Sequence, residues 1–214
     1  MNFVWFGHSA VLLKYRGKKI IVDPFVDEKM DADIICLTHG HSDRLESAVE
    51  IAERSGAEVV AIFELAKHLK ARGVNATGMN LGGGVEIGGI RINMVDARHS
   101  SSIIGDGGII YAGSPCGYVF ELDKKVYHAG DTSLFRDMKS IRDLYEPEIG
   151  FLPAEGFYTM DEQQASTAAE WLGHSRIIPI HYNTFDALRT DLKRLKGVLG
   201  GRLVVPEIGK TYEL

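Results

Sequence analysis

The chain has 214 residues, of which 45% are hydrophobic, 25% are charged and 9% are aromatic. This composition is typical of a folded globular protein and excludes a disordered or fibrous chain. The net charge of -5 argues against a protein that binds nucleic acid through its phosphates. No apolar run approaches the roughly 18 residues of a membrane span. The N-terminus carries neither a basic leader nor a cleavage motif, so we expect a cytoplasmic protein without membrane contact.

The first half of the chain predicts strands, followed by alternating strands and helices. Residues 11–15 and 18–22 flank a turn at 16–17 and predict a hairpin, which Pro24 ends because proline cannot donate to a β-ladder. The apolar run 33–38 predicts a buried strand that leads directly into polar residues. Hydrophobic periodicity then predicts helices over 45–55 and 64–72, with a strand over 58–62 between them.

The second half predicts hairpins first and then a return to alternation. Hairpins are expected over 85–95 and 117–129, and the small, glycine-rich residues 100–114 between them predict an irregular, mobile segment. Strands are then expected over 148–152, 176–180 and 203–205. A capping box at 159–162 predicts a helix to residue 172, and Asn183 or Thr184 is expected to begin another helix whose apolar face carries Leu188, Leu192 and Leu195.

Both halves of the chain share a crude order, with strands first and then strands mixed with helices. We therefore predict an α/β protein with one domain over 1–214, built as a four-layer αββα sandwich of two mixed sheets with helices on the outer faces. Cys36 and Cys116 lie in apolar stretches and are expected to be buried free thiols.

Metal-binding residue types follow directly on the strand at 33–38. In an extended segment residues i and i+2 point the same way, so His39 and His41 can face one point, and Asp43 extends the row. Two imidazoles with a carboxylate suit zinc, manganese, iron or nickel, whereas calcium takes oxygen ligands. The alternative is a pair of surface histidines at the start of a helix, and we favour the metal site.

Three further residues occupy the same kind of position. His99, Asp131 and His181 each lie just past the end of an expected strand. Ligands gathered from several strand ends at one sheet edge are what a preorganised metal site requires. Each residue alone is more often an ordinary polar residue, but the three together support the metal hypothesis.

The order of these motifs resembles that of the metallo-β-lactamase superfamily: His-x-His-x-Asp, a later His, a Gly-Asp and a final His after a strand. Several stretches are also similar to the small metal-dependent hydrolases related to ascorbate-6-phosphate lactonase. They are Gly7-His8-Ser9-Ala10, Asp23-Pro24-Phe25, His99-Ser100-Ser101, His128-Ala129-Gly130-Asp131-Thr132 and His181-Tyr182-Asn183-Thr184-Phe185. The resemblance covers essentially the whole chain and implies an αββα fold with a hydrolytic site for one or two metals.

The resemblance also implies roles for the candidate residues. It gives His39, His41 and His99 to a first metal, Asp131 to a bridge between two metals, and Asp43 and His181 to part of a second site. Asp23 matches the acidic residue that supports the histidine loop and fixes the imidazole orientation.

Residue 44 departs from the family pattern, which continues with a histidine where this chain has Arg44. Arginine stays cationic and does not bind metals. Three hypotheses follow: a weaker second metal, an arginine that replaces the second metal by compensating the carboxylates, or an arginine that points to solvent or is an engineered substitution. We favour a dominant first site with a weak or absent second metal. The expected cofactor is one or two divalent ions of zinc, manganese or nickel.

The expected chemistry is hydrolysis by a metal-activated water. Asp131 or Asp43 is expected to orient the water and accept its proton, while Arg44, His8 or His181 stabilises developing negative charge. His8 is also open to a purely structural role. The substrate is expected to be a small, polar and even anionic lactone, ester or phosphoester, and the segment 100–114 is expected to border the site and affect substrate choice.

Smaller hypotheses concern residues beside these motifs. His128 lies within an expected strand and points away from the candidate ligands, which favours a structural role. Glu155 is expected either to reach the rim of the site and pair with Arg44 or to be a solvated loop residue.

Two other functions remain open on the sequence. One is nuclease activity on the same fold, against which the net charge counts. The other is a metal-binding or ligand-sensing protein in which Arg44 marks a decayed second site. A small-molecule partner is expected in the hydrolase case, nucleic acid is not, and the sequence allows a homo-oligomer.

Overall fold

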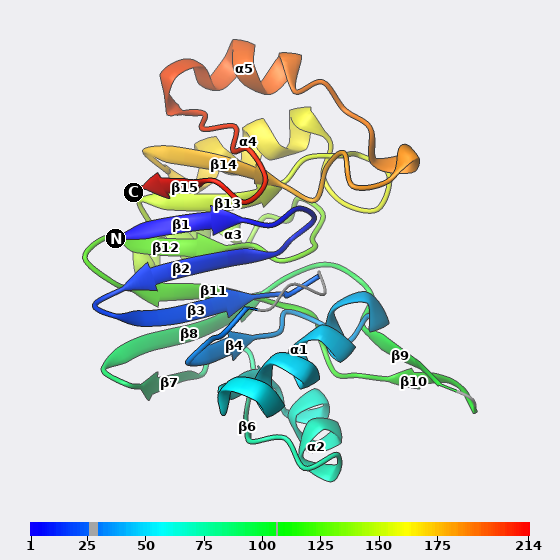
Figure 1. Cartoon of the computed structure of the whole chain (residues 1–214). Helices are drawn as coiled ribbons and strands as arrows, with labels where there is room; N and C mark the ends of the chain where they lie inside the picture. Colours follow the sequence, from blue (N-terminus) through cyan, green and yellow to red (C-terminus); the bar gives the residue numbers. More distant parts are fainter. Residues whose placement is uncertain (26–29, 106) are drawn as a thin grey trace.

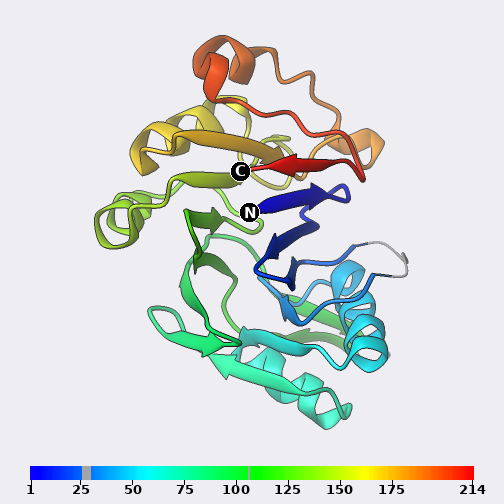
Figure 2. The ribbon, with the colours of Figure 1, turned by 60° about the vertical axis from the view of Figure 1, so that its left-hand side comes forward.

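Two mixed β-sheets pack face to face, and helices lie on the outer face of each (Figure 1, Figure 2). The computed structural model describes residues 1–25, 30–105 and 107–214, without the side chains of residues 42 and 43. The predicted four-layer αββα sandwich is thus confirmed. Within the described ranges, no helix is both long enough and apolar enough to span a bilayer.

The first sheet has seven strands in the order β15-β1-β2-β3-β4-β5-β6. Pairing is antiparallel from β15 to β3 and parallel from β3 to β6, where helices α1 (Ser42–Ser55) and α2 (Phe63–Ala71) make the crossovers between β4, β5 and β6. The strands are β1 (Asn2–Trp5), β2 (Val11–Tyr15), β3 (Lys18–Val22), β4 (Ile34–Cys36), β5 (Glu58–Ile62), β6 (Ala76–Met79) and β15 (Thr211–Glu213).

The second sheet has six strands in the order β14-β13-β12-β11-β8-β7. The three strands β12, β13 and β14 are parallel, with helices α3 (Met138–Tyr145) and α4 (Glu162–Leu172) as crossovers, and α5 (Lys193–Leu199) packs on α4. The strands are β7 (Gly84–Ile87), β8 (Ile90–Asp96), β11 (Cys116–Glu121), β12 (Lys125–His128), β13 (Ile149–Pro153) and β14 (Arg176–Ile180).

Buried side chains between the sheets join them into one core. The ring of Phe3 on β1 lies 5.2 Å from that of Phe151 on β13, edge to face. The Tyr118 hydroxyl on β11 crosses the sandwich to donate to the carbonyl oxygens of Leu37 at 2.8 Å and Val60 at 3.1 Å. Both cysteines are buried and free, as predicted.

The irregular segment that the sequence predicts over residues 100–114 is wrong. They form not an irregular segment but an antiparallel hairpin of β9 (Ser102–Gly105) and β10 (Gly108–Tyr111), which extends from the body of the molecule (Figure 1). The β-branched pairs Ile103-Ile104 and Ile109-Ile110 favour strands and outweigh the neighbouring glycines.

The C-terminal elements correct three more expectations. The strand expected over 203–205 is wrong, because Leu203 makes only an isolated bridge to Ile177, and β15 is the last strand. The helix expected after residue 183 is interrupted, since Leu192 has a left-handed backbone with φ 56° and separates the 3-10 turn η1 (Asp186–Leu188) from α5. Helix α4 is capped by Asp161 rather than Thr159, through a 2.7 Å bond from the Gln164 N–H to the Asp161 Oδ1.

Candidate metal centre

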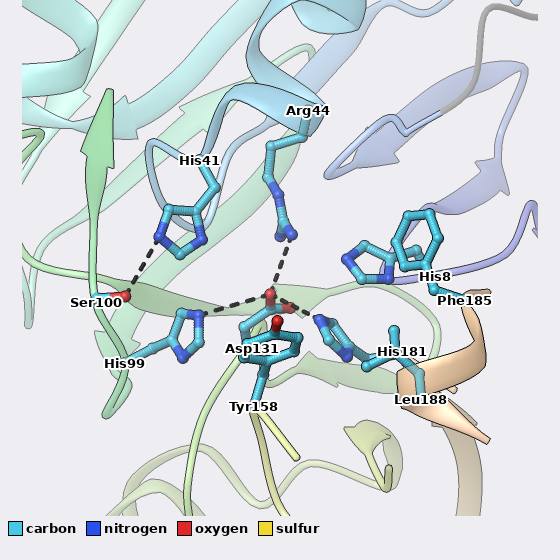
Figure 3. A pocket seen from close by; sticks show the side chains of 10 residues that line it. All are labelled: His8, His41, Arg44, His99, Ser100, Asp131, Tyr158, His181, Phe185 and Leu188. Carbon is cyan, nitrogen blue, oxygen red and sulfur yellow. Dashed lines mark hydrogen bonds and ion pairs between the residues drawn. The ribbon is translucent and has the colours of Figure 1, made fainter. Parts of the chain in front are cut away.

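Residues just past the ends of four strands meet at one end of the sandwich. His39 and His41 follow β4 of the first sheet, whereas His99, Asp131 and His181 follow β8, β12 and β14 of the second sheet. The site therefore exists only when the two sheets pack together. Figure 3 shows Asp131 at its centre, with His99 on one side and His181 on the other.

His39, His41 and His99 present imidazole nitrogens that lie within 4.8 Å of one another. The Nε2 of His39 and the Nδ1 of His41 are 2.9 Å apart, and the His99 ring centroid lies 5.0 Å and 5.2 Å from theirs. The ring planes cross at 76° to 85°, so the three rings do not stack but direct their edges to a common point. This donor set fits a transition metal such as zinc, manganese or nickel.

Hydroxyl groups fix the tautomers that such a metal needs. Thr38 Oγ1 donates its proton to Asp23 Oδ2 at 2.6 Å, so it accepts from the Nδ1–H of His39 at 2.9 Å and leaves the His39 Nε2 as a ligand. Ser100 Oγ lies 3.3 Å from the His41 Nε2, which suits a proton on that nitrogen and leaves the Nδ1 of His41 as a ligand.

His39 and His99 are held neutral, which is the form that binds metals. Burial lowers the pKa of His39 well below its usual value, and the nearby Arg44 guanidinium lowers it further. Burial lowers the pKa of His99 to about 4, although the Asp131 carboxylate opposes this. Neither imidazole therefore needs to lose a proton before it binds a metal at neutral pH.

One carboxylate oxygen of Asp131 lies near histidines on both sides of the site, His99 on one side and His181 on the other. Asp131 Oδ2 lies 3.0 Å from Arg44 Nη2, 3.1 Å from His181 Nε2, 3.5 Å from His39 Nε2 and 3.9 Å from His99 Nε2. Ser9 Oγ donates to Asp131 Oδ1 at 2.6 Å and holds the carboxylate in place. Burial raises the pKa of Asp131, but Arg44 and the two buried histidines outweigh it and leave that pKa well below its usual value, so the group is ionised.

A second group of ligand-capable residues joins Asp131 to His8 and His181, whose donor atoms also lie within 4.8 Å of one another. The His8 and His181 rings are 3.9 Å apart, and the His181 N–H donates to the His8 carbonyl oxygen at 2.7 Å. Burial lowers the pKa of His181, but Asp131 more than offsets it and the pKa is raised overall. His8 therefore lies in the site, as one of the two sequence hypotheses expects.

Arg44 is buried between two carboxylates, so the hypothesis that it points to solvent is wrong. The side chain comes from the first turn of α1, and Arg44 is 1% exposed. Its Nη1 donates to Asp23 Oδ2 at 3.1 Å and its Nη2 to Asp131 Oδ2 at 3.0 Å. Burial raises the pKa of Asp23 to about 6, although Arg44 lowers it, and both oxygens of Asp23 bind Thr38.

Three of the candidate residues adopt left-handed backbone conformations. The φ angles are 47° at His8, 45° at Asp23 and 55° at His181. Such a conformation costs a residue with a Cβ about 1–2 kcal/mol. The fold therefore stabilises these residues in positions that the backbone alone disfavours, as is common at functional sites.

The remaining sequence hypotheses have mixed outcomes. The side chain of Asp43 lies outside the described residues. His128 is buried, contacts the Ser9 carbonyl oxygen through Nε2 at 3.0 Å and accepts from the Gly130 N–H, which fits the structural role expected of it. Glu155 is not solvated, because its side chain is 0% exposed, accepts three backbone N–H bonds from 157–159 and lies 3.6 Å from His181 Nδ1.

The candidate residues open into a pocket of about 470 Å³. Ser100 lies on its wall, so the segment that begins beside His99 borders the site. Sequence reasoning missed Ser9, Thr38 and the pocket residues Tyr158, Phe185 and Leu188. Ser9 and Phe185 lie in stretches that carry the family resemblance, whereas nothing in the sequence indicates Tyr158, which the chain brings in from a loop after β13.

Comparison with known proteins agrees with this geometry. Residues 2–181 match the family model for the beta-lactamase superfamily domain. The chain is 41% identical to a UPF0173 metal-dependent hydrolase of Thermoplasma acidophilum, over 100% of this chain and 99% of that protein. It is also 41% identical to one from Geobacillus thermodenitrificans, over 100% of both chains.

A solved structure has the same fold over the same length. Igni18, described as a novel metallo hydrolase from Ignicoccus hospitalis, superimposes with a TM-score of 0.87 at 33% identity, covering 100% of this chain and 98% of that one. The family model and the relatives thus cover most or all of the chain. The chain belongs to the metallo-β-lactamase superfamily.

Proposed function

We propose that this metal-dependent hydrolase binds one divalent transition metal through His39, His41 and His99 and hydrolyses a small lactone, ester or phosphoester. The observation that carries the proposal is the convergence of three imidazoles beside the Asp131 carboxylate in one pocket. A bound divalent cation supplies a Lewis acid and lowers the pKa of water towards about 7. The pocket of about 470 Å³ suits a small-molecule substrate.

The chain's own residues then have separate tasks. Asp131 is ionised and faces the three histidines, so it orients the water and accepts its proton. His8 and His181 lie on the opposite side of Asp131 and are placed to stabilise negative charge on the substrate oxygen. The proposed relation to ascorbate-6-phosphate lactonase, and a catalytic part for Asp43, remain predictions.

Replacement of one ligand and of the proposed base tests this function. We expect His41→Ala to abolish both metal binding and metal-stimulated turnover. Asp131→Asn keeps the size of the side chain and is expected to reduce turnover about 10²-fold or more while the metal stays bound. The assay uses lactones, esters and phosphoesters with added zinc, manganese or nickel, and His68→Ala on α2 is the matched control. Undiminished activity in either site variant contradicts the proposal.

Arg44 supplies positive charge at the position where the resemblance to the superfamily implies a histidine ligand of a second metal. Its guanidinium is buried and bonded to Asp23 and to Asp131 Oδ2, the same oxygen that faces His181. A second divalent ion beside this oxygen would be repelled by a fixed cation in a site of low dielectric. We therefore expect the chain to hold one metal.

Metal content by mass spectrometry tests the part played by Arg44. The wild-type protein and Arg44→Lys, which keeps the charge, are expected to hold one ion per chain. Arg44→His removes the charge and adds a ligand, so about two ions per chain are expected after equilibration with excess metal. Two ions in the wild-type protein, or one in Arg44→His at full folding, contradicts the replacement of the second metal by arginine.

A further inference from the structure

The pocket at the metal centre has two unlike sides. Its metal-binding side consists of His41, His99 and Asp131, whereas Tyr158, Phe185 and Leu188 contribute apolar surface. Figure 3 shows His41 and His99 on the side opposite to Phe185 and Leu188. Tyr158 is 61% exposed and Phe185 54% exposed, so both rings offer apolar surface to a molecule in the pocket. We call Tyr158, Phe185 and Leu188 the apolar wall.

The apolar wall is held in place by its neighbours. The Phe185 ring lies 5.8 Å from that of Phe25 and 6.0 Å from that of His8, in edge-to-face contacts. The His8 N–H donates to Thr184 Oγ1 at 3.1 Å and fixes the residue before Phe185. Leu188, the last residue of the turn η1, is 1% exposed and anchors this turn. Phe185 and Leu188 are thus in place before a ligand arrives, which reduces the entropic cost of binding.

The charges of the pocket do not favour a phosphate. Among its described lining residues, Arg44 is the single arginine or lysine, and its guanidinium already bonds Asp23 and Asp131. Phosphate recognition ordinarily uses several N–H donors from arginine or lysine. The Asp131 carboxylate, in the middle of the pocket, offers oxygen acceptors rather than N–H donors to a phosphate.

We infer that the substrate is an uncharged carboxylic ester or lactone whose apolar alkyl or aryl group packs on the apolar wall, an inference that rests on the proposed hydrolase function. In the reaction the hydroxyl of water joins the acyl carbon, the acyl carbon–oxygen bond breaks, and the departing oxygen receives the remaining proton. An ester yields a carboxylic acid and an alcohol, and a lactone yields one hydroxy acid. The phosphoester alternative is thereby set aside.

A substrate series measures the contribution of the wall. With p-nitrophenyl acetate, propionate and butyrate, kcat/KM is expected to rise by up to about fourfold for each methylene group that packs on the wall. In Phe185→Ala this rise is expected to disappear, whereas Phe63→Ala on α2, which removes a ring of 47% exposure that is not among the residues lining the pocket, keeps it. Faster turnover of p-nitrophenyl phosphate than of the esters, or a flat series in the wild-type protein, overturns the inference.

A binding experiment separates this inference from the proposed function. In metal-free protein, N-benzylacetamide is expected to bind about tenfold more tightly than N-methylacetamide by NMR titration, and Phe185→Ala is expected to lose the difference. Equal binding of the two amides overturns the inference even if esters are hydrolysed. Tighter binding of the benzyl compound in a protein that hydrolyses no ester, lactone or phosphoester supports the wall and rejects the proposed function.

Discussion

Thr38 links the buried Asp23 carboxylate to the candidate metal ligand His39, and this link decides which nitrogen of His39 can bind a metal. The hydroxyl donates to Asp23 and therefore accepts from His39. Groups of this kind raise the basicity of the ligand and fix the ring, and their loss typically weakens metal binding by about 10- to 100-fold. The arrangement explains why a buried, left-handed Asp23 is kept so close to the histidine loop.

Thr38→Val keeps the shape of the side chain and removes the hydroxyl. We expect it to weaken zinc binding by about 10- to 100-fold, because His39 Nδ1 and Asp23 both lose their partner. Thr38→Ser restores the hydroxyl and is expected to bind zinc nearly as the wild-type protein does. Competition with a chromophoric chelator measures both constants, and equal affinities of the two variants would contradict the link.

For single residues, the sequence indicates which side chains belong to the site better than it indicates where the fold places them. The spacing of His39 and His41 after an apolar strand is enough to indicate a metal site, because strand geometry relates residues i and i+2. Ser9 and Tyr158 are different, since their roles arise only from chain segments that meet in the folded molecule. Arg44 shows the same limit: its identity is plain in the sequence, but its burial between Asp23 and Asp131 is not.

Among the elements, the β9–β10 hairpin lies directly against the histidine loop. A Cβ added to Gly40, between the two histidines, would lie 2.3 Å from the Cβ of Ala112 at the base of the hairpin. The Gly40 N–H also points to Ser101 Oγ at 3.3 Å. Packing therefore requires a glycine at position 40, because a larger residue would clash with the hairpin. The same loop that carries His39 and His41 thus positions the hairpin.

Gly40→Ala is expected to push the hairpin base away from the loop. Overpacking of this kind costs about 1–3 kcal/mol of stability, and the displacement of Ser100 from His41 is expected to weaken metal binding as well. Thermal unfolding and chelator competition measure the two effects. The double variant Gly40→Ala with Ala112→Gly is expected to recover most of both. Gly197→Ala in α5 serves as the control, because no described atom outside the helix's own backbone lies within 4 Å of the added Cβ.

Elements with their own periodicity are the ones that the sequence predicts well. Helices α1 and α2 have apolar faces that repeat every three to four residues, and both appear close to the expected bounds. The hairpin β9–β10 was expected to be irregular because its glycines obscured four isoleucines. Strand β15 was missed altogether, since Thr211–Glu213 becomes a strand by pairing with β1 at the other end of the chain.

For the whole molecule, the site depends on how closely the two sheets approach. Gly130 has φ 65°, and a Cβ there would lie 2.8 Å from the Cβ of Thr38 and 2.8 Å from the Cys116 carbonyl oxygen. The close approach of the Gly130 backbone to Thr38 brings the loop of Asp131 against the loop of His39, so the ligands of both sheets reach one point. The sequence predicted two packed sheets, but the order of their strands and the contact at Gly130 depend on tertiary packing alone.

His174 makes the stability of the whole fold depend on pH. Its ring lies under β13, where Gly150 leaves room for it, since a Cβ on Gly150 would lie 2.2 Å from His174 Cδ2. The His174 Nδ1–H donates to the Pro147 carbonyl oxygen at 2.9 Å, and burial lowers the pKa of His174 to about 4. The ring lies apart from the candidate metal ligands, so its titration reports on folding rather than on metal binding.

The direction of this pH dependence follows from the pKa values of His174 in the unfolded chain and in the folded protein. The unfolded chain takes up a proton at His174 below pH of about 6.5, whereas the folded protein does not until about pH 4, so stability falls as pH falls between them. When the pH falls from 7 to 5, this one group is expected to lower the free energy of unfolding by on the order of 2 kcal/mol. Urea unfolding of the metal-free protein at both pH values measures the loss. His174→Asn keeps a donor toward Pro147 without a titrating group, so it is expected to lose less stability over this interval than the wild-type protein, and an equal loss in both would contradict the assignment.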